Sequence, residues 1–386
     1  MRIFKLIFKN ALRHKLRTLL TILGMAIAVM AFCVLRTVVD MYYAGLDATA
    51  ANRLITRQAV SFIFPLPYSY RDQIARIPGV QTVSFANWFG GTYKEKRNFF
   101  ARMGVDAETI FDVYPECLVD AKEFEQFKRE RNSCIVGSEI AKQYGFKVGD
   151  IIPMDGDIYP GKWEFVVRGI YKPRDKVTDA TQMFFHWSYI DERMKQDMPS
   201  RAGQVGWYIV KIKDPSQAAA ISEQIDGLFK NSSNATKTET ERAFTQNFIS
   251  GFNSLLTAMN FVAYIIIGII MLVLGNTMIM SARERTREYA VFKTLGFSGG
   301  HLFGLILGES LFISALGAGA GLLVTYPMVS GIEALMPKGF FPYFFITPFT
   351  LILAATAALV VGLAASIFPI QRALRTRIVD GLRFIG

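Results

Sequence analysis

Long runs of apolar residues divide this chain. A helix needs about 20 mostly apolar residues to cross the hydrocarbon core of a bilayer. Four runs reach this length, and each holds at most one charged side chain. They predict transmembrane helices at 18–39, 254–280, 302–329 and 349–370. The alternative is that each run is a buried helix of a soluble core, but four such runs in one chain argue against it.

The first run follows basic residues, as the apolar part of a secretory signal also does. Its apolar stretch is longer than the 7–15 residues typical of a signal, and no small-residue cleavage site follows it. We therefore expect a retained membrane anchor.

Charge predicts the orientation of the four spans. Residues 1–17, 281–301 and 371–386 hold fourteen Lys and Arg and three acids, a difference equal to the whole formal net charge of +11. Residues 40–253 hold 27 bases and 27 acids. Because basic loops stay in the cytoplasm, we expect both termini and 281–301 inside, and 40–253 and 330–348 outside. The chain is then a multi-pass protein of the inner (cytoplasmic) membrane. Topology explains the basic residues, so we expect no nucleic-acid partner.

Residues 1–17 alternate apolar and basic positions with helical spacing. Phe4, Phe8 and Leu12 share one face, whereas Lys5 and Lys9 lie on another. This pattern favours an amphipathic cytoplasmic helix along the membrane lipid. The simpler interpretation is a basic flank of the first span.

The external segment 40–253 predicts a mixed α/β domain inserted between spans one and two, with a stalk. Aromatic and β-branched runs predict strands at 162–173 and 205–214. A helix is expected at 216–230 with Ser216 as its N-cap. Residues 239–253 are expected to continue helically into the second span.

The cytoplasmic loop 281–301 carries the densest charge pattern, SARERTREYAVFKTLG. It predicts one short helix ended by Gly296. This helix is either an ordinary solvated linker or a docking element for a cytosolic partner. In the second case Tyr289 and Phe292 would be its apolar anchors.

Glu309 lies about 10 Å into the third span, at 1.5 Å per residue. A carboxylate inside a membrane is a functional candidate by default. At this depth it also reaches a cytoplasmic-side partner such as the loop helix, so structural anchoring is favoured over a proton or substrate role. Arg36, near the outer end of the first span, is expected to extend toward the headgroups.

Small residues recur at four-residue spacing in the third and fourth spans, which permits close helix contact within one chain or between two. The recurring positions are Gly304, Gly308, Gly317, Gly321, Ala354, Ala358 and Gly362.

Candidate chemistry is sparse. Cys117 and Cys134 lie in the external segment, where they either form a disulfide or remain two separate thiols. The three histidines are far apart, so no metal site and no catalytic triad emerges. No Gly-x-x-x-x-Gly-Lys-Ser/Thr phosphate loop occurs, so we expect no catalytic residue and no cofactor bound by this chain.

Several motifs together resemble a known family. ERTREYAVFKTLGFS followed by GES is similar to the coupling segment of MacB/FtsX-type (type VII) ABC transporter permeases. RIPGVQTVS and YGFKVGDIIPM resemble that family's extracytoplasmic domain, and ASIFPIQRALRTRIVDGLR resembles its closing segment. The size of the external segment is similar to that of MacB, whereas the lack of a phosphate loop departs from MacB itself, in which ATPase and permease are fused. The overall length and a separate ATPase resemble the LolC/LolE permeases.

The resemblance implies how the chain works. The loop helix would insert into a cytosolic ABC ATPase dimer, a separate subunit that binds ATP and Mg. A second permease copy or a paralogue is implied, and a periplasmic adaptor protein with an outer-membrane channel is a further option. The residues matching the coupling helix are Arg283, Glu284, Arg285, Thr286, Arg287, Glu288 and Tyr289.

The function implied is mechanotransmission, the coupling of cytosolic ATP hydrolysis to conformational work outside the membrane. Efflux or extraction of periplasmic or lipid-phase cargo is the leading form. The alternative is a non-transporting signal relay that controls a cell-wall hydrolase or senses a peptide. An intramembrane enzyme is disfavoured, because the spans hold almost no titratable groups.

The charge distribution makes a topological prediction. A reporter fused after residue 386 should behave as cytoplasmic, and one fused near residue 230 should behave as exported, because the basic flanks hold the first on the inner side. Paired phosphatase and fluorescent-protein fusions measure this. Exported behaviour at both positions would contradict the orientation.

Overall fold

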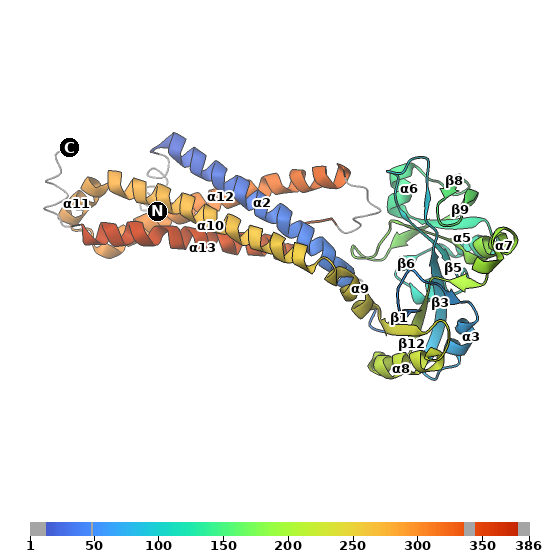
Figure 1. Cartoon of the computed structure of the whole chain (residues 1–386). Helices are drawn as coiled ribbons and strands as arrows, with labels where there is room; N and C mark the ends of the chain where they lie inside the picture. Colours follow the sequence, from blue (N-terminus) through green and yellow to red (C-terminus); the bar gives the residue numbers. More distant parts are fainter. Residues whose placement is uncertain (1–12, 48, 336–343, 377–386) are drawn as a thin grey trace. The chain divides into compact units, whose positions relative to one another are not determined.

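The computed structural model describes residues 13–47, 49–335 and 344–376, which form two compact units (Figure 1). The helical unit holds residues 13–40, 252–333 and 344–376, and the α/β unit holds most of 41–251. Most of the predicted amphipathic helix 1–17 lies outside the described residues, as do parts of the loop 330–348 and of the tail 371–386.

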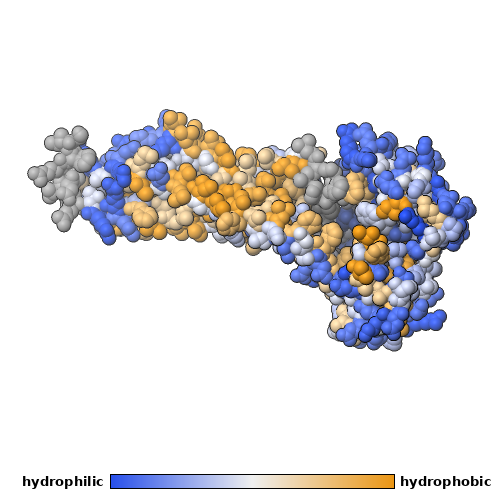
Figure 2. All heavy atoms as spheres, viewed as in Figure 1, coloured by the Kyte–Doolittle hydropathy of each residue, from blue (hydrophilic) through white to orange (hydrophobic). Residues whose placement is uncertain are grey.

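Among the described residues, four helices are long and apolar enough to cross a membrane, as predicted. They are α2 (Lys15–Asp47), α10 (Asn253–Glu284), α12 (Gly299–Leu335) and α13 (Pro348–Arg375), and the short α11 (Thr286–Thr294) follows α10. In Figure 2 the long helices carry a broad apolar surface, with hydrophilic residues gathered at the end that holds α11. Such a surface suits lipid rather than water.

Small residues bring these helices close together within one chain. A Cβ at Gly317 would lie 2.7 Å from Cβ of Met25, and one at Gly321 would lie 2.7 Å from the carbonyl oxygen of Ala26. A Cβ at Gly362 would lie 3.0 Å from Cβ of Ser314. Gly304 instead faces open space. The small-residue pattern therefore marks helix contacts at some of its positions only.

Polar side chains also join the spans at the end that leads to the α/β unit. Arg36 pairs with Asp40 across one helical turn at 3.0 Å and donates to Asn260 at 3.0 Å. The hydroxyls of Thr347 and Thr350 both donate to Asp40, at 2.8 and 2.6 Å. Arg36 is thus held by protein groups instead of extending toward headgroups.

The α/β unit is built on a mixed sheet in the order β13-β1-β12-β3-β5-β10-β7-β9-β8-β4, with β6 paired to β9. Neighbouring strands are antiparallel except β5 with β10 and β7 with β9. Its strands are β1 (Arg53–Gln58), β3 (Val80–Trp88), β4 (Gly91–Thr92), β5 (Ala101–Val105), β6 (Cys117–Leu118), β7 (Ser133–Gly137), β8 (Ile151–Gly156), β9 (Gly161–Pro173), β10 (Gln182–His186), β12 (Trp207–Ile212) and β13 (Thr236–Thr240). β2 (Leu66–Pro67) and β11 (Gln204–Val205) form a second, small sheet.

Short helices cover this sheet. They are α3 (Tyr70–Ala75), α4 (Ile110–Val113), α5 (Ala121–Arg129), α6 (Ser138–Tyr144), α7 (Trp187–Asp197), α8 (Ala218–Phe229) and α9 (Glu241–Ser250), with 3-10 turns at Pro199–Arg201 and Pro215–Gln217. The predicted mixed α/β domain between spans one and two is confirmed.

Two local predictions are wrong. Ser216 is not the N-cap of α8, because the carboxylate of Asp214 accepts the Ser216 N–H and holds a 3-10 turn before the helix. The predicted stalk does not run unbroken into the second span, since α9 ends at Ser250 and α10 begins at Asn253.

Packed aromatic rings hold together the part of the α/β core around Phe89. This side chain is fully buried, and its ring lies 5.4–6.0 Å from the rings of Tyr159, Trp163, Phe165 and Phe185. Edge-to-face pairs of this kind add to the free energy of burial. The cluster joins the segment after β3 and the turn before β9 to β9 and β10.

Phe89→Ala should lower the free energy of unfolding of the α/β unit by about 3–5 kcal/mol, because it leaves a cavity among four rings. Thermal unfolding of the purified full chain, followed by tryptophan fluorescence, measures this. The matched control is Val60→Ala, whose side chain is 80% exposed and which should leave the midpoint unchanged. Equal midpoints for both variants would contradict the packing argument.

Candidate functional site

The charged loop between α10 and α12 forms a break followed by a short helix. Arg285 adopts a non-helical conformation between the end of α10 and the start of α11. The chain leaves α11 at Gly296, whose φ of +86° suits glycine, as predicted. The Phe297 N–H donates to the Phe292 carbonyl at 3.0 Å and satisfies the helix end. The segment predicted as one short helix is therefore divided between the last turn of α10 and the separate helix α11.

Glu309 and Arg285 form a buried ion pair. Nη1 of Arg285 donates to Oε2 of Glu309 at 2.7 Å, and both residues are less than 10% exposed. Nε of Arg285 donates to Glu288 at 3.2 Å. Burial opposes the charge of Arg285, but the facing carboxylates outweigh it and hold the pKa of this guanidinium above its usual value. The structure thus places Glu309, the acid predicted inside the third span, against Arg285 of the loop.

Glu288 and a further acid, Glu284, connect to the start of α2 and to the residues just before it. Arg13 donates to Glu288, and Arg17 donates to Glu284 at 2.7 Å. Partial burial of Glu288 opposes ionisation, yet its bonds from Arg13 and Arg285 lower its pKa. The carboxylate therefore stays charged at neutral pH. Two separate sets of ion pairs result. One runs from Arg13 through Glu288 and Arg285 to Glu309 of α12. The other joins Arg17 of α2 to Glu284 of α10.

Lys293 ties α11 to the end of α13. Its Nζ donates to the backbone carbonyls of Leu374 and Thr376, at 2.9 and 2.7 Å. A cation at a helix C-terminus satisfies carbonyls that lack intrahelical partners and complements the helix dipole. α11 is therefore tied to the end of α13 through Lys293, and to Arg13 and Arg285 through Glu288.

One face of the loop segment stays exposed. Arg283, Arg287, Val291 and Leu295 recur every fourth residue, and all four are exposed. Among the described residues, neither of the two arginines forms an ion pair. The side chains of Val291 and Leu295 are 40% and 69% exposed. Arg287, Val291 and Leu295 lie four residues apart along α11 and its C-terminal end, so they share a single surface, which we call the α11 face. Arg283 lies before the break, in the last turn of α10.

Tyr289, predicted as an apolar anchor for a partner, faces the core of its own chain. It is 5% exposed and packs in the core of the helical unit, where burial raises its pKa to about 12. Phe292 is half-buried against the same core. The sequence analysis missed Val291 and Leu295, although their spacing from Arg283 and Arg287 was a usable signal.

The two external cysteines are free thiols. Cys117 and Cys134 belong to different clusters of buried side chains. Burial raises the pKa of Cys117 to about 12, and that of Cys134 is raised as well. The structure therefore favours two separate, unreactive thiols over a disulfide.

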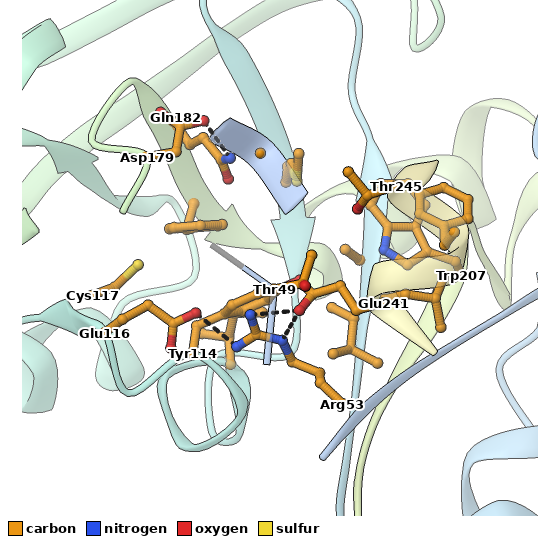
Figure 3. A pocket seen from close by; sticks show the side chains of 18 of the residues that line it. Thr49, Arg53, Tyr114, Glu116, Cys117, Asp179, Gln182, Trp207, Glu241 and Thr245 are labelled. Atoms are coloured by element: carbon orange, nitrogen blue, oxygen red, sulfur yellow. Dashed lines mark hydrogen bonds and ion pairs between the residues drawn. The ribbon is translucent and has the colours of Figure 1, made fainter. Parts of the chain in front are cut away.

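The α/β unit contains a cavity of about 520 Å³ (Figure 3). Its apolar wall includes Trp88, Phe184 and Trp207 from the sheet, and α9 contributes Phe244. At one end lies Arg53, which is 2% exposed. The sequence analysis missed this site, because its lining comes from positions between 45 and 248 with no local motif.

Two acids hold Arg53 in the cavity wall. Its guanidinium reaches Glu116 and Glu241 at 2.7 Å each, and it donates to the Val113 carbonyl at 2.8 Å. It also lies over the ring of Tyr114, with 4.2 Å between the guanidinium carbon and the ring centroid. Burial alone would lower the pKa of Arg53, but these neighbours raise it above its usual value. The group therefore remains a cation.

Comparison with known families matches both units. The profile of the MacB-like periplasmic core domain covers residues 18–228, more than half of the chain, and that of the FtsX-like permease C-terminal region covers 260–378.

Curated relatives are also permeases. An uncharacterised ABC transporter permease of Mycobacterium tuberculosis is 24% identical over 259 residues, which are 67% of this chain and 29% of that relative. One of Methanocaldococcus jannaschii is 23% identical over 350 residues, which are 86% of this chain and 84% of that relative. The chain thus spans less than a third of the first relative.

Solved structures of low similarity include two external domains. One is the periplasmic region of MacB from Actinobacillus actinomycetemcomitans, with 12% identity and a TM-score of 0.38, covering 53% of this chain and 95% of that one. The other is the extracellular domain of the ABC-type transporter YknZ from Gram-positive bacteria, with 12% identity and a TM-score of 0.36, covering 49% of this chain and all of that one. On the two family matches, this chain belongs to the FtsX-like ABC transporter permeases with a MacB-like periplasmic core domain.

Proposed function

We propose that this chain is the membrane subunit of an ABC transporter and that a separate cytosolic ATPase dimer docks on the α11 face. The observation that carries the proposal is the contrast between the two sides of α11. One side is tied to its own chain by the ion pairs of Glu288 with Arg13 and Arg285, and the other exposes Arg287, Val291 and Leu295. Arginine is enriched among the residues that dominate interface energies, and exposed apolar side chains beside it gain free energy when a partner removes them from water.

The ties of α11 suggest how movement is transmitted. A displacement of α11 acts on α12 through Glu309 and on α2 through Glu288 and Arg13. α2 and α10 are also the two spans that connect along the sequence to the α/β unit. ATP-driven movement at the α11 face would therefore reach both connections to that unit.

The proposed work is efflux or extraction of periplasmic or lipid-phase cargo. ATP and Mg²⁺ would bind to the partner ATPase. A second permease copy or a paralogue would complete the assembly, because an ATPase dimer offers two docking grooves. Membership of the permease family and the basic cytoplasmic flanks support this arrangement.

Docking is tested by Arg287→Glu combined with Leu295→Ser. Co-purification of the co-expressed cognate ATPase should fall by about tenfold or more, because the double variant removes a charge and an apolar contact from the interface. The control is Arg97→Glu with Leu228→Ser, which makes the same changes at exposed positions of the α/β unit. Undiminished association of the first variant would refute docking on the α11 face.

The role of Glu309 is tested by stability. Glu309→Gln should destabilise the full chain in detergent by about 3 kcal/mol, because it leaves the buried Arg285 without its closest counter-charge. Arg285→Met with Glu309→Leu should recover much of that loss, since no unpaired charge remains. Thermal unfolding midpoints measure both. An unchanged midpoint for Glu309→Gln together with lost transport would instead support a proton or substrate role.

A further inference from the structure

The cavity of the α/β unit has the size and lining of a small-molecule site. Its volume of about 520 Å³ lies within the roughly 300–1,000 Å³ of typical ligand pockets. Aromatic and aliphatic side chains make most of its wall, among them Trp88, Met103, Phe184 and Trp207. A molecule of drug size would bury most of its apolar surface there.

The polar end of this cavity carries more negative than positive charge. Arg53 faces two carboxylates, those of Glu116 and Glu241. A third acid, Asp179, also lines the cavity, and both of its oxygens accept hydrogen bonds from Thr181 or Gln182. The cavity lining therefore contains one guanidinium and three carboxylates.

The guanidinium of Arg53 already donates to protein acceptors. Among the described residues, Glu116 and Glu241 each have one carboxylate oxygen that accepts no hydrogen bond. Oε2 of Glu241 accepts from Arg53 and from the Ala50 N–H, and Oε1 of Glu116 accepts from Arg53. Within the described part of the chain, Oε1 of Glu241 and Oε2 of Glu116 accept no hydrogen bond. Burial raises the pKa of Glu241 despite the facing guanidinium, so this carboxylate would gain from a further cation.

We propose that this cavity binds an apolar molecule that carries one ammonium group, with the ammonium at Glu116 and Glu241 and the apolar body against Trp88, Phe184 and Trp207. An ammonium supplies up to three donors to the unpartnered carboxylate oxygens. It also gains from the faces of the aromatic rings. A carboxylate or phosphate ligand is excluded, because the excess charge of the cavity is negative.

Ligand binding here goes beyond ATPase coupling and needs no partner chain. Gly45, in the last turn of α2, lines the cavity, as do Thr245 and Phe248 of α9. These segments adjoin the two connections of the α/β unit to the helical unit. A bound molecule would contact the last turn of α2 and α9.

Dansylcadaverine, a fluorescent aromatic amine conjugate, is a suitable probe for the purified full chain. All four tryptophans of the chain lie in the α/β unit, and two of them line the cavity. Binding is followed by energy transfer from tryptophan to dansyl. The matched probes are neutral dansylamide and the carboxylate dansyl-aminohexanoate. The amine should bind at least about tenfold more tightly than the carboxylate, a difference of one charge pair.

Glu116→Gln should weaken the amine by about tenfold and leave dansylamide unchanged, because Arg53 keeps its pairing with Glu241. Glu223→Gln, on an exposed turn of α8, is the matched control. Thr245→Phe should weaken the binding of all three probes, because the larger side chain narrows the cavity. Thr245 is half-buried on α9, so this variant leaves the buried core unchanged.

Equal binding of amine and carboxylate, no binding of the amine, or amine binding insensitive to both Glu116→Gln and Thr245→Phe would each overturn the proposal. Docking of the ATPase is measured on other residues and without the probe. A failure here therefore leaves the α11 face untouched, and the reverse also holds.

Discussion

The Arg285–Glu309 pair is the interaction on which the helical unit depends at the end that holds α11. Neither charge is stable there alone, because an unpaired ion in a medium of low polarity costs several kcal/mol. Together they hold the start of α11 against α12 at 2.7 Å. Glu288 and Arg13 extend the same network to the residues just before α2. If an ATPase docks on α11 as proposed, the helix must be fixed to its own protein to transmit movement, and these charges provide contacts of that kind.

A second polar cluster performs the corresponding task at the other end of the spans. Asp40 accepts from Arg36 and from two threonine hydroxyls that belong to the start of α13. Between the two clusters, contact relies on small residues such as Gly317 and Gly321, which let backbones approach closely. Apolar packing in lipid lacks the driving force it has in water. Polar ties at both ends therefore set which helix faces which.

The α/β unit places function on a different physical basis. Its sheet is rigid, with a core of interlocked rings around Phe89, and its cavity lies on the sheet face beneath α9. Arg53 is held by acids from α9 and from the segment after α4, so its charge is compensated twice over. The resulting negative excess is the basis for the proposed preference of the cavity for a cation.

The sequence by itself determined the spans and the mixed α/β insertion, because apolar length and strand patterns are local properties. It also predicts an orientation from the basic flanks. It also located Gly296 as the end of the loop helix. Only the tertiary structure decided which side of that helix is free: Tyr289 turned inward, and Val291 and Leu295 stayed exposed. Likewise, Arg53, Glu116 and Glu241 meet across nearly 190 positions of sequence. Contacts of that kind depend on how strands and helices pack, which no short motif encodes.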